Sequence, residues 1–326
     1  MPPLLQIRDL QTWFPIKRGV LARTTGYIHA VDGISFEMAP GETVGLVGES
    51  GCGKTTLGRT IMGLEAKRSG DMLLGGTPLW PVRHHDSLPL RRRVQMIFQD
   101  PYSSLNPRMT IRDIITEGLI EQRLVKPRER DEAALRLLGE VGMEPSAMHR
   151  YPHEFSGGQR QRISIARAIA VKPELVICDE SVSALDVSVR AQVLNLLISL
   201  RASHNLAYLF ISHDLGVVRH IATRVIVMYM GRAVETGLSS EVLDAPAHPY
   251  SRALISAIPV PFGEARQRII LQGEVPSSAT PPSGCRFRTR CPLAIPACAD
   301  HVPSLEPVSV GATRQVACIR KDEIQP

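Results

Sequence analysis

The sequence has no apolar run close to the length of a membrane-spanning helix. Such a helix needs about 20 consecutive apolar residues. The most apolar pieces, Leu175–Cys178 and Ala207–Ser212, have the length of buried strands. We therefore expect no transmembrane segment, so any membrane association has to come through partner chains.

A secretory signal is also missing. The first residues, Met-Pro-Pro-Leu-Leu-Gln-Ile-Arg-Asp, contain neither the basic segment nor the apolar stretch of a signal peptide. We expect the chain to be made and to stay in the cytoplasm, as a peripheral protein of the cytoplasmic face of the cell membrane if partners recruit it there.

No nucleic-acid-binding module accompanies the basic charge. The 326 residues include 38 Lys and Arg against 32 Asp and Glu, a net charge of +6. That balance is compatible with nucleic acid or anionic lipid as a partner. The two signs alternate along most of the chain, however, and so we expect no nucleic-acid partner.

Strand and helix patterns alternate through most of the chain. The expected strands are 4–10, 34–38, 43–47, 94–98, 175–178, 207–211 and 224–228, and the expected helices are 54–62, 159–170, 189–203 and 216–222. A loop with Pro15, Gly19 and Gly26 is expected between the first two strands. This order predicts an α/β fold, a parallel sheet with helices on both faces.

Two stretches interrupt that order. Residues 101 to about 158 have a helical pattern, in which Thr110 can cap a helix carrying Ile111, Ile114, Ile115 and Leu119, and a second helix carries Ala134, Leu137, Leu138 and Val141. Beyond Ala245 the composition shifts to proline, and four of the six cysteines follow residue 284. We expect an inserted helical subdomain and a small loop-rich extension, residues 246–326.

The string at residues 48–55, named the phosphate loop below, fits the P-loop pattern. Its residues are Gly48, Glu49, Ser50, Gly51, Cys52, Gly53, Lys54 and Thr55. The glycines allow backbone N–H groups to surround phosphates at a helix N-terminus, Lys54 reaches the outer phosphates, and Thr55 offers a hydroxyl to Mg²⁺. The preceding strand and following helix favour ATP binding over a turn without a ligand.

Two further strings carry charge or exposed N–H groups. The strand 175–178 ends in Asp179, suited to the Mg²⁺ shell, and Glu180, suited to polarising the attacking water. Ser156, Gly157, Gly158 and Gln159 directly precede a helix and form a second anion-binding N-terminus. One chain thus has two predicted phosphate sites.

These ordered motifs resemble the ATPase subunits of the ABC transporter family over about residues 4–245. In family terms Ser156–Gln159 match the signature motif, Gln99 the Q-loop, Ser183–Asp186 the D-loop and His213 the switch histidine. The resemblance implies a P-loop NTPase fold and nucleotide contacts from the phosphate loop, Thr56, Ser156–Gln159 and Asp186. It also implies catalytic roles for Glu180, His213 and Gln99, and Mg²⁺ ligands in Thr55, Gln99 and Asp179.

The extension resembles that of the oligopeptide and dipeptide importers, through His248-Pro249-Tyr250 and Gly284-Cys285-Arg286-Phe287. Within that group, residues 15–26, 106–108 and 187–192 are most similar to the second of two unequal ATPase subunits. The resemblance implies head-to-tail pairing of two ATPase subunits, so that each ATP lies between one phosphate loop and the facing signature motif. The implied partners are a second ATPase subunit, two transmembrane permease subunits and an extracytoplasmic solute-binding protein.

Several alternatives stay open. The implied cargo is a di- or oligopeptide, but nickel or another small solute fits a related subunit. A non-transport ABC ATPase is a less favoured alternative, because such proteins usually have two ATPase domains or a coiled-coil insertion. A P-loop kinase is also less favoured, because it has no use for Ser156–Gln159. Tyr27 is a candidate to stack on adenine, with Phe14 as a rival and packing as the plain interpretation.

One residue departs from the family pattern. The family usually has proline after the catalytic glutamate, and Ser181 stands there instead. Because serine does not fix φ, we expect a looser link from Glu180 to the D-loop.

Four cysteines of the extension, Cys285, Cys291, Cys298 and Cys318, are candidates for a staple in a segment too proline-rich for a large core. Disulfides are disfavoured in a reducing compartment. Their gaps of five, six and nineteen residues lack the tight pairs of structural zinc sites. The importer group includes members with a [4Fe–4S] cluster at this place, and zinc or no metal are the alternatives.

Overall fold

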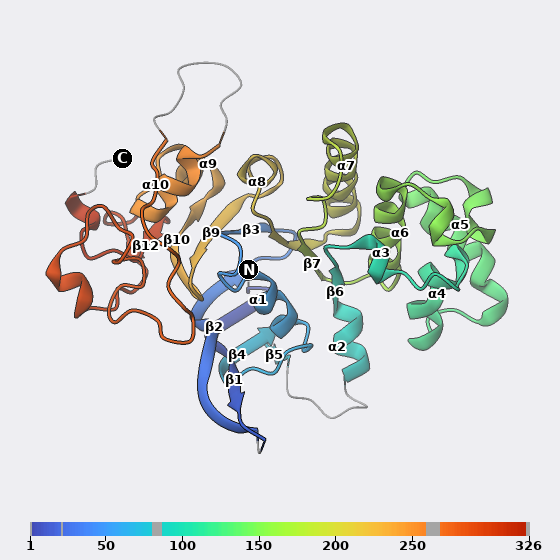
Figure 1. The fold of residues 1–326 in the computed structure, drawn as a ribbon. Coiled ribbons are helices and arrows are strands. Elements are labelled where there is room, and N and C mark those ends of the chain that lie inside the picture. The colour runs from blue at the N-terminus through green and yellow to red at the C-terminus, as the bar shows by residue number, and fades with distance from the viewer. Residues whose placement is uncertain (1, 21, 80–86, 259–267, 324–326) are drawn as a thin grey trace. The chain divides into compact units, whose positions relative to one another are not determined.

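The computed structural model describes residues 2–20, 22–79, 87–258 and 268–323 (Figure 1). The chain forms two compact units. Unit 1 comprises residues 39–42 and 79–210, and unit 2 comprises residues 2–38, 43–78 and 211–326. Among the described residues no helix is both long and apolar enough to cross a membrane.

Unit 2 begins with a long antiparallel hairpin, visible in blue in Figure 1. Strand β1 (Leu5–Arg18) pairs with β2 (Arg23–Met38), and β1 also pairs with β4 (Ser69–Leu74), which is followed by β5 (Thr77–Pro78). The predicted loop between shorter strands was wrong, because Pro15 and Gly26 lie inside the two strands. Pro15 lies beyond the pairing of β1 with β4, which runs from Leu5 to Gln11, and proline is tolerated in such an edge segment.

Five further strands of unit 2 are hydrogen-bonded neighbours in the order β11-β12-β10-β9-β3. They are β3 (Thr43–Val47), β9 (Arg224–Tyr229), β10 (Arg232–Leu238), β11 (Glu306–Pro307) and β12 (Gln315–Val316). Strands β3 and β9 are parallel, as predicted, and all five residues of β3 are buried. Strand β10 runs antiparallel to β9, and it is absent from the predicted elements, as are β4, β5, β11 and β12.

The helices of unit 2 are short. They are α1 (Lys54–Ile61), α8 (Leu215–Ile221), α9 (Ser239–Asp244) and α10 (Pro249–Ser256). After α10 the described extension is mostly irregular, with 3₁₀ turns η5 (Pro296–Ala299) and η6 (Lys321–Glu323). Its packing centre is Phe287, whose ring lies 5.2 Å from that of Tyr229 and 5.4 Å from that of Tyr250.

Unit 1 contains three neighbouring strands, β6 (Val94–Ile97), β7 (Leu175–Asp179) and, apart from its last residue, β8 (Ala207–Ile211). Strands β6 and β7 are parallel, in register from Val94 opposite Leu175 to Ile97 opposite Cys178. Helices α2 (Ser87–Arg93), α6 (Gly157–Ala170) and α7 (Val187–His204) connect or flank them in the chain. The predicted α/β alternation is therefore confirmed here.

The helical stretch of unit 1 contains α3 (Pro101–Ser104), α4 (Ile111–Glu121) and α5 (Arg130–Glu140). Three 3₁₀ turns, η2 (Pro127–Glu129), η3 (Pro145–His149) and η4 (Pro152–Glu154), join these helices to each other and to α6. The predicted cap is present, since Thr110 Oγ1 accepts a hydrogen bond from the N–H of Asp113 at 3.3 Å. The apolar face of α4 is buried through Ile111, Ile114, Ile115 and Leu119.

Candidate nucleotide site and cysteine pocket

The phosphate loop connects β3 to α1 in unit 2. Its glycines are required by geometry at two positions, Gly48 and Gly53, where φ is 153° and 105°. A Cβ atom at Gly48 would collide with the carbonyl oxygen of Met228, and one at Gly53 with that of Ala30. Only glycine lets the backbone pass this close, and so the loop keeps the tight curve that a phosphate-binding backbone needs.

Lys54 is the buried cation of this loop. Its side chain is 5% exposed, and Nζ donates to the carbonyl oxygens of Gly48 and Glu49, both at 2.9 Å. The ammonium therefore lies across the loop rather than in solvent. Thr55 and Thr56 follow in the first turn of α1, and both are half-buried. Burial raises the pKa of the neighbouring Cys52 thiol, although the charge of Lys54 opposes that shift.

Two of the predicted catalytic side chains meet in unit 1. Asp179 ends β7 and is 3% exposed. Glu180 follows with φ of 44°, a left-handed conformation that is strained for glutamate. Gln99 Nε2 donates to Glu180 Oε2 at 2.9 Å, so the amide after β6 holds the carboxylate after β7.

The turn after Glu180 is closed by Ser183. Its N–H and its Oγ both donate to the carbonyl oxygen of Glu180, at 3.1 and 2.8 Å. These bonds hold the start of the D-loop without a proline at Ser181, which is itself 3% exposed. Asp186 then stands at the N-cap position of α7.

Ser156–Gln159 form the N-terminus of α6. Ser156 Oγ accepts from the N–H of Gln159 at 3.4 Å, and Gln159 Oε1 accepts from the N–H of Ser156 at 3.0 Å. This reciprocal capping box fixes the entry to the helix. Gly157 is the first helical residue, and a Cβ atom at Gly158 would collide with Val189 of α7, so glycine is required for this helix contact.

His213 and Tyr27 belong to unit 2. His213 is exposed just after β8, before Asp214, which caps α8 by accepting from the N–H groups of Gly216 and Val217. Tyr27 lies in β2 and is 37% exposed. The guanidinium of Arg68 lies 4.9 Å from the centre of its ring, so one partner already covers Tyr27.

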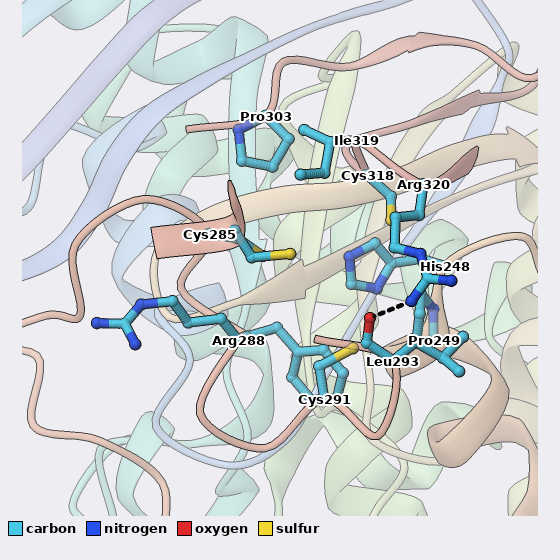
Figure 2. A pocket seen from close by; sticks show the side chains of 12 residues that line it. His248, Pro249, Cys285, Arg288, Cys291, Leu293, Pro303, Cys318, Ile319 and Arg320 are labelled. Atoms are coloured by element: carbon cyan, nitrogen blue, oxygen red, sulfur yellow. Dashed lines mark hydrogen bonds between the residues drawn. The ribbon is translucent and has the colours of Figure 1, made fainter. Parts of the chain in front are cut away.

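Cys285, Cys291, Cys298 and Cys318 line one pocket, together with His248 and Phe287. Figure 2 shows the sulfur atoms of Cys285, Cys291 and Cys318 directed into the same space. All four thiols are free of disulfides. Burial raises the pKa of Cys291 to about 11, and hydrogen bonding to the backbone of Leu293 opposes the shift.

The four cysteines do not form a ready single-ion site. Over residues 2–20, 22–79, 87–258 and 268–323, no group of three or more His, Cys, Asp or Glu side chains is arranged to hold a metal ion. His248 Nδ1 accepts a hydrogen bond from the N–H of Tyr250 at 3.0 Å. Burial lowers the pKa of His248 to about 3, which keeps the imidazole neutral.

The extension contacts the phosphate loop in a way that the sequence did not predict. Arg290 Nη1 donates to Glu49 Oε2 at 2.8 Å, and Tyr250 Oη accepts from the N–H of Glu49 at 2.8 Å. Glu49 was predicted only as a member of a glycine-rich string. No local sequence pattern predicts a contact between residues that lie 241 positions apart in the chain.

Comparison with protein-family models gives two matches. The model described as ABC transporter matches residues 31–183, and the one described as oligopeptide/dipeptide transporter, C-terminal region, matches residues 234–298. The first covers the phosphate loop, the signature motif and Glu180, and the second covers three of the four pocket cysteines.

Similar proteins match over nearly the whole chain. The oligopeptide transport ATP-binding protein AppF of Bacillus subtilis is 49% identical over 319 residues, covering 97% of this chain and 96% of that protein. A probable peptide ABC transporter ATP-binding protein, y4tS of Sinorhizobium fredii, is 51% identical over 316 residues, covering 97% of this chain and 89% of that protein.

Solved structures share the fold. The structure of cbiO1 from Clostridium perfringens, part of the ABC transporter complex cbiONQ, matches with a TM-score of 0.64 at 24% identity, covering 75% of this chain and 92% of that one. The ATP-binding cassette MJ0796, a dimer bound to ADP and Pi, matches with the same TM-score and identity over 72% of this chain and 98% of that one. The chain therefore belongs to the ABC transporter family, as one of its ATP-hydrolysing subunits, in the group with the oligopeptide/dipeptide transporter C-terminal region.

Proposed function

We propose that this chain uses ATP hydrolysis to power the import of di- or oligopeptides through partner membrane subunits. The observation that carries the proposal is the joining, in one chain, of a phosphate loop and signature motif to the C-terminal region of oligopeptide and dipeptide transporters. The proposed ATPase domain is residues 4–245, with a helical subdomain at about 101–158, and the extension is residues 246–326.

The site residues have distinct proposed roles. Backbone N–H groups of the phosphate loop and Lys54 bind the phosphates, with Thr56 beside them, and Tyr27 or Phe14 is the adenine contact. Thr55, Gln99 and Asp179 offer the oxygen ligands that Mg²⁺ prefers, and the bound ion would neutralise charge on the phosphates. Glu180 orients and polarises the attacking water.

Hydrolysis also requires a second ATPase subunit in this proposal. Ser156, Gly158 and Gln159, at the N-terminus of α6, and Asp186 would contact the nucleotide bound to the facing subunit. A γ-phosphate adds charge that this helix end can neutralise, so ATP favours the closed pair more than ADP does. His213 contacts the γ-phosphate, and Gln99 reports closure through the helical subdomain to two permease subunits.

Transport of labelled peptide into vesicles tests the cargo. The vesicles contain this chain, its partner ATPase and the two permeases, and the solute-binding protein is added on the opposite side. ATP-dependent peptide accumulation supports the proposal. Accumulation of Ni²⁺ or another small solute, without peptide uptake, would show that this ATPase subunit powers the transport of a different cargo.

We also propose that the cysteine pocket holds a [4Fe–4S] cluster. The support is the donor set, four cysteines without disulfides around one pocket, and backbone N–H groups of Phe287, Leu293 and Arg320 that hydrogen-bond three of the thiols. Zinc needs its sulfurs about 2.3 Å from one ion, whereas a cluster distributes its cysteines over separate irons. In this proposal the cluster would staple the extension.

Anaerobic purification tests this second proposal. The protein should be brown, with iron and acid-labile sulfide near four each per chain, and Cys298→Ser should lose both. Colourless anaerobic protein with stoichiometric zinc, or without metal, would contradict the cluster.

A further inference from the structure

The extension holds one residue of the phosphate loop from two sides. Arg290 Nη1 and Nη2 donate to the two carboxylate oxygens of Glu49, at 2.8 and 3.3 Å. The N–H of Glu49 donates to Tyr250 Oη at 2.8 Å. All three residues belong to unit 2, so these contacts lie within one compact body.

Arg290 is itself held in place. Its side chain is 8% exposed, and Nη1 also lies 3.5 Å from Tyr229 Oη. The segment from Cys285 to Cys291, which carries Arg290, is anchored by Arg286, whose guanidinium contacts the carboxylate of Asp32 and the carbonyl oxygen of Met230. The fork of Arg290 is therefore presented in a fixed position, which lowers the entropy cost of its bidentate contact.

Tyr250 is equally fixed. It is fully buried, and its ring lies 4.7 Å from that of Tyr229 and 5.4 Å from that of Phe287. The hydroxyl is the end of a rigid aromatic cluster, so the N–H of Glu49 meets an acceptor that does not move with the loop.

Glu49 also binds Lys54 within the phosphate loop, as Gly48 does. The carbonyl oxygens of Gly48 and Glu49 accept from Lys54 Nζ. One residue thus has its N–H, its carbonyl oxygen and its carboxylate all bound. A phosphate-binding loop that is already shaped before the ligand arrives spends less of the binding free energy on ordering itself.

We propose that Arg290 and Tyr250 are positioning residues for nucleotide binding: they fix Glu49 and thereby pre-shape the phosphate loop. The proposal rests on the assignment of residues 48–55 as the phosphate site. It gives the extension a part in the ATP cycle beyond its own folding. A plain structural role, in which the contact only holds the extension down, is the competing account.

Nucleotide titration of the full-length chain separates the two accounts. The probe is a fluorescent ATP analogue with Mg²⁺, and the variants are Arg290→Ala, Tyr250→Phe, Glu49→Gln and the double variant Arg290→Ala with Glu49→Gln. We expect Arg290→Ala to bind about tenfold more weakly, since a bidentate charge-assisted contact is lost. The loss should be smaller for Arg290→Lys, which restores the charge without the fork.

The double variant is the decisive measurement. If Arg290 acts through Glu49, Arg290→Ala should cost little further affinity once Glu49→Gln has removed the charge. In the assembled transporter, Arg290→Ala should raise KM for ATP about tenfold and change kcat less than about twofold, because the lost interaction concerns binding. Tyr250→Phe, which keeps the aromatic ring, tests the same idea if Arg290→Ala fails to fold.

Two controls keep the outcomes apart. Arg219→Ala breaks an arginine–carboxylate pair of similar length, 2.7 Å to Asp244, elsewhere in unit 2, and should leave affinity unchanged. Lys54→Ala should weaken binding strongly, and its failure to do so would overturn the phosphate-site assignment itself. If Lys54→Ala behaves as expected while folded Arg290→Ala and Tyr250→Phe bind like the wild type, the positioning role is refuted. The role is equally refuted if Arg290→Ala loses as much affinity with Glu49→Gln as without it.

Discussion

Replacing Gly51 and Gly53 separately by alanine should have very different effects, although both lie in the phosphate loop. Both have positive φ, 77° and 105°. At Gly51 nothing lies within 4 Å of an added Cβ atom, whereas at Gly53 the atom would collide with the carbonyl oxygen of Ala30 and approach Met228 Cε to 2.8 Å. Gly51→Ala therefore tests backbone strain alone, whereas Gly53→Ala tests backbone strain together with the collision of the added Cβ atom with its neighbours.

The expected magnitudes follow from these contacts. A left-handed conformation costs an alanine about 1–2 kcal/mol, and this term applies to both variants. Gly53→Ala adds the cost of moving packed neighbours, about 1–3 kcal/mol. The smaller entropy of the unfolded alanine chain offsets about 0.4–1 kcal/mol in both variants. We therefore expect Gly51→Ala to lower the free energy of unfolding by about 1 kcal/mol, and Gly53→Ala by about 1.5–4 kcal/mol.

Urea unfolding followed by circular dichroism measures both values, and ATP-analogue titration measures the consequence for the site. Gly51→Ala should retain binding, while Gly53→Ala should lose most of it because the loop must open to relieve the collision. Equal destabilisation by the two alanines would refute the close-approach argument, and so would normal nucleotide binding by a folded Gly53→Ala variant.

Three other predictions concern catalysis, assembly and pH. Glu180→Gln should keep ATP bound in the assembled transporter but slow turnover by at least about a hundredfold, since general-base assistance is lost; near-normal turnover would place that role elsewhere. The isolated chain should hydrolyse ATP poorly until its partner subunits are added, because Ser156–Gln159 act on the facing nucleotide; full activity of a dilute monomer would contradict this. His248 has a folded-state pKa of about 3, below the 6.5 of an unfolded histidine, so protonation of the unfolded chain should cost about 2 kcal/mol of stability between pH 7 and pH 5. Urea unfolding at both pH values should show this loss in the wild type and a smaller one in His248→Gln.

The motifs were predictable because each is local. The phosphate loop, the strand ending at Asp179 and the helix after Ser156 depend on neighbours within a few residues, and the structure has each element within two residues of its predicted bounds. The bounds of β3 and β8 were predicted without error, since both are short apolar runs between turn residues.

The failures came from residues whose meaning depends on distant partners. Pro15 and Gly26 have the composition of a loop, yet the pairing of β1 with β2 carries both into a hairpin. Strand β10 lacks a clean apolar run and is defined by β9 beside it. The contact of Arg290 with Glu49 depends on how the extension folds back within unit 2, which periodicity does not encode.

The capping box at the start of α6 determines how the N–H groups of this helix end are hydrogen-bonded in the chain by itself. Ser156 and Gln159 each accept a hydrogen bond from the N–H group of the other, so these two N–H groups are bonded without any partner chain. The Ser156 bond is long, at 3.4 Å, and is therefore cheap to give up when a stronger acceptor arrives. In the proposed pairing with a second ATPase subunit, this helix end would exchange that bond for one to a phosphate of the facing nucleotide.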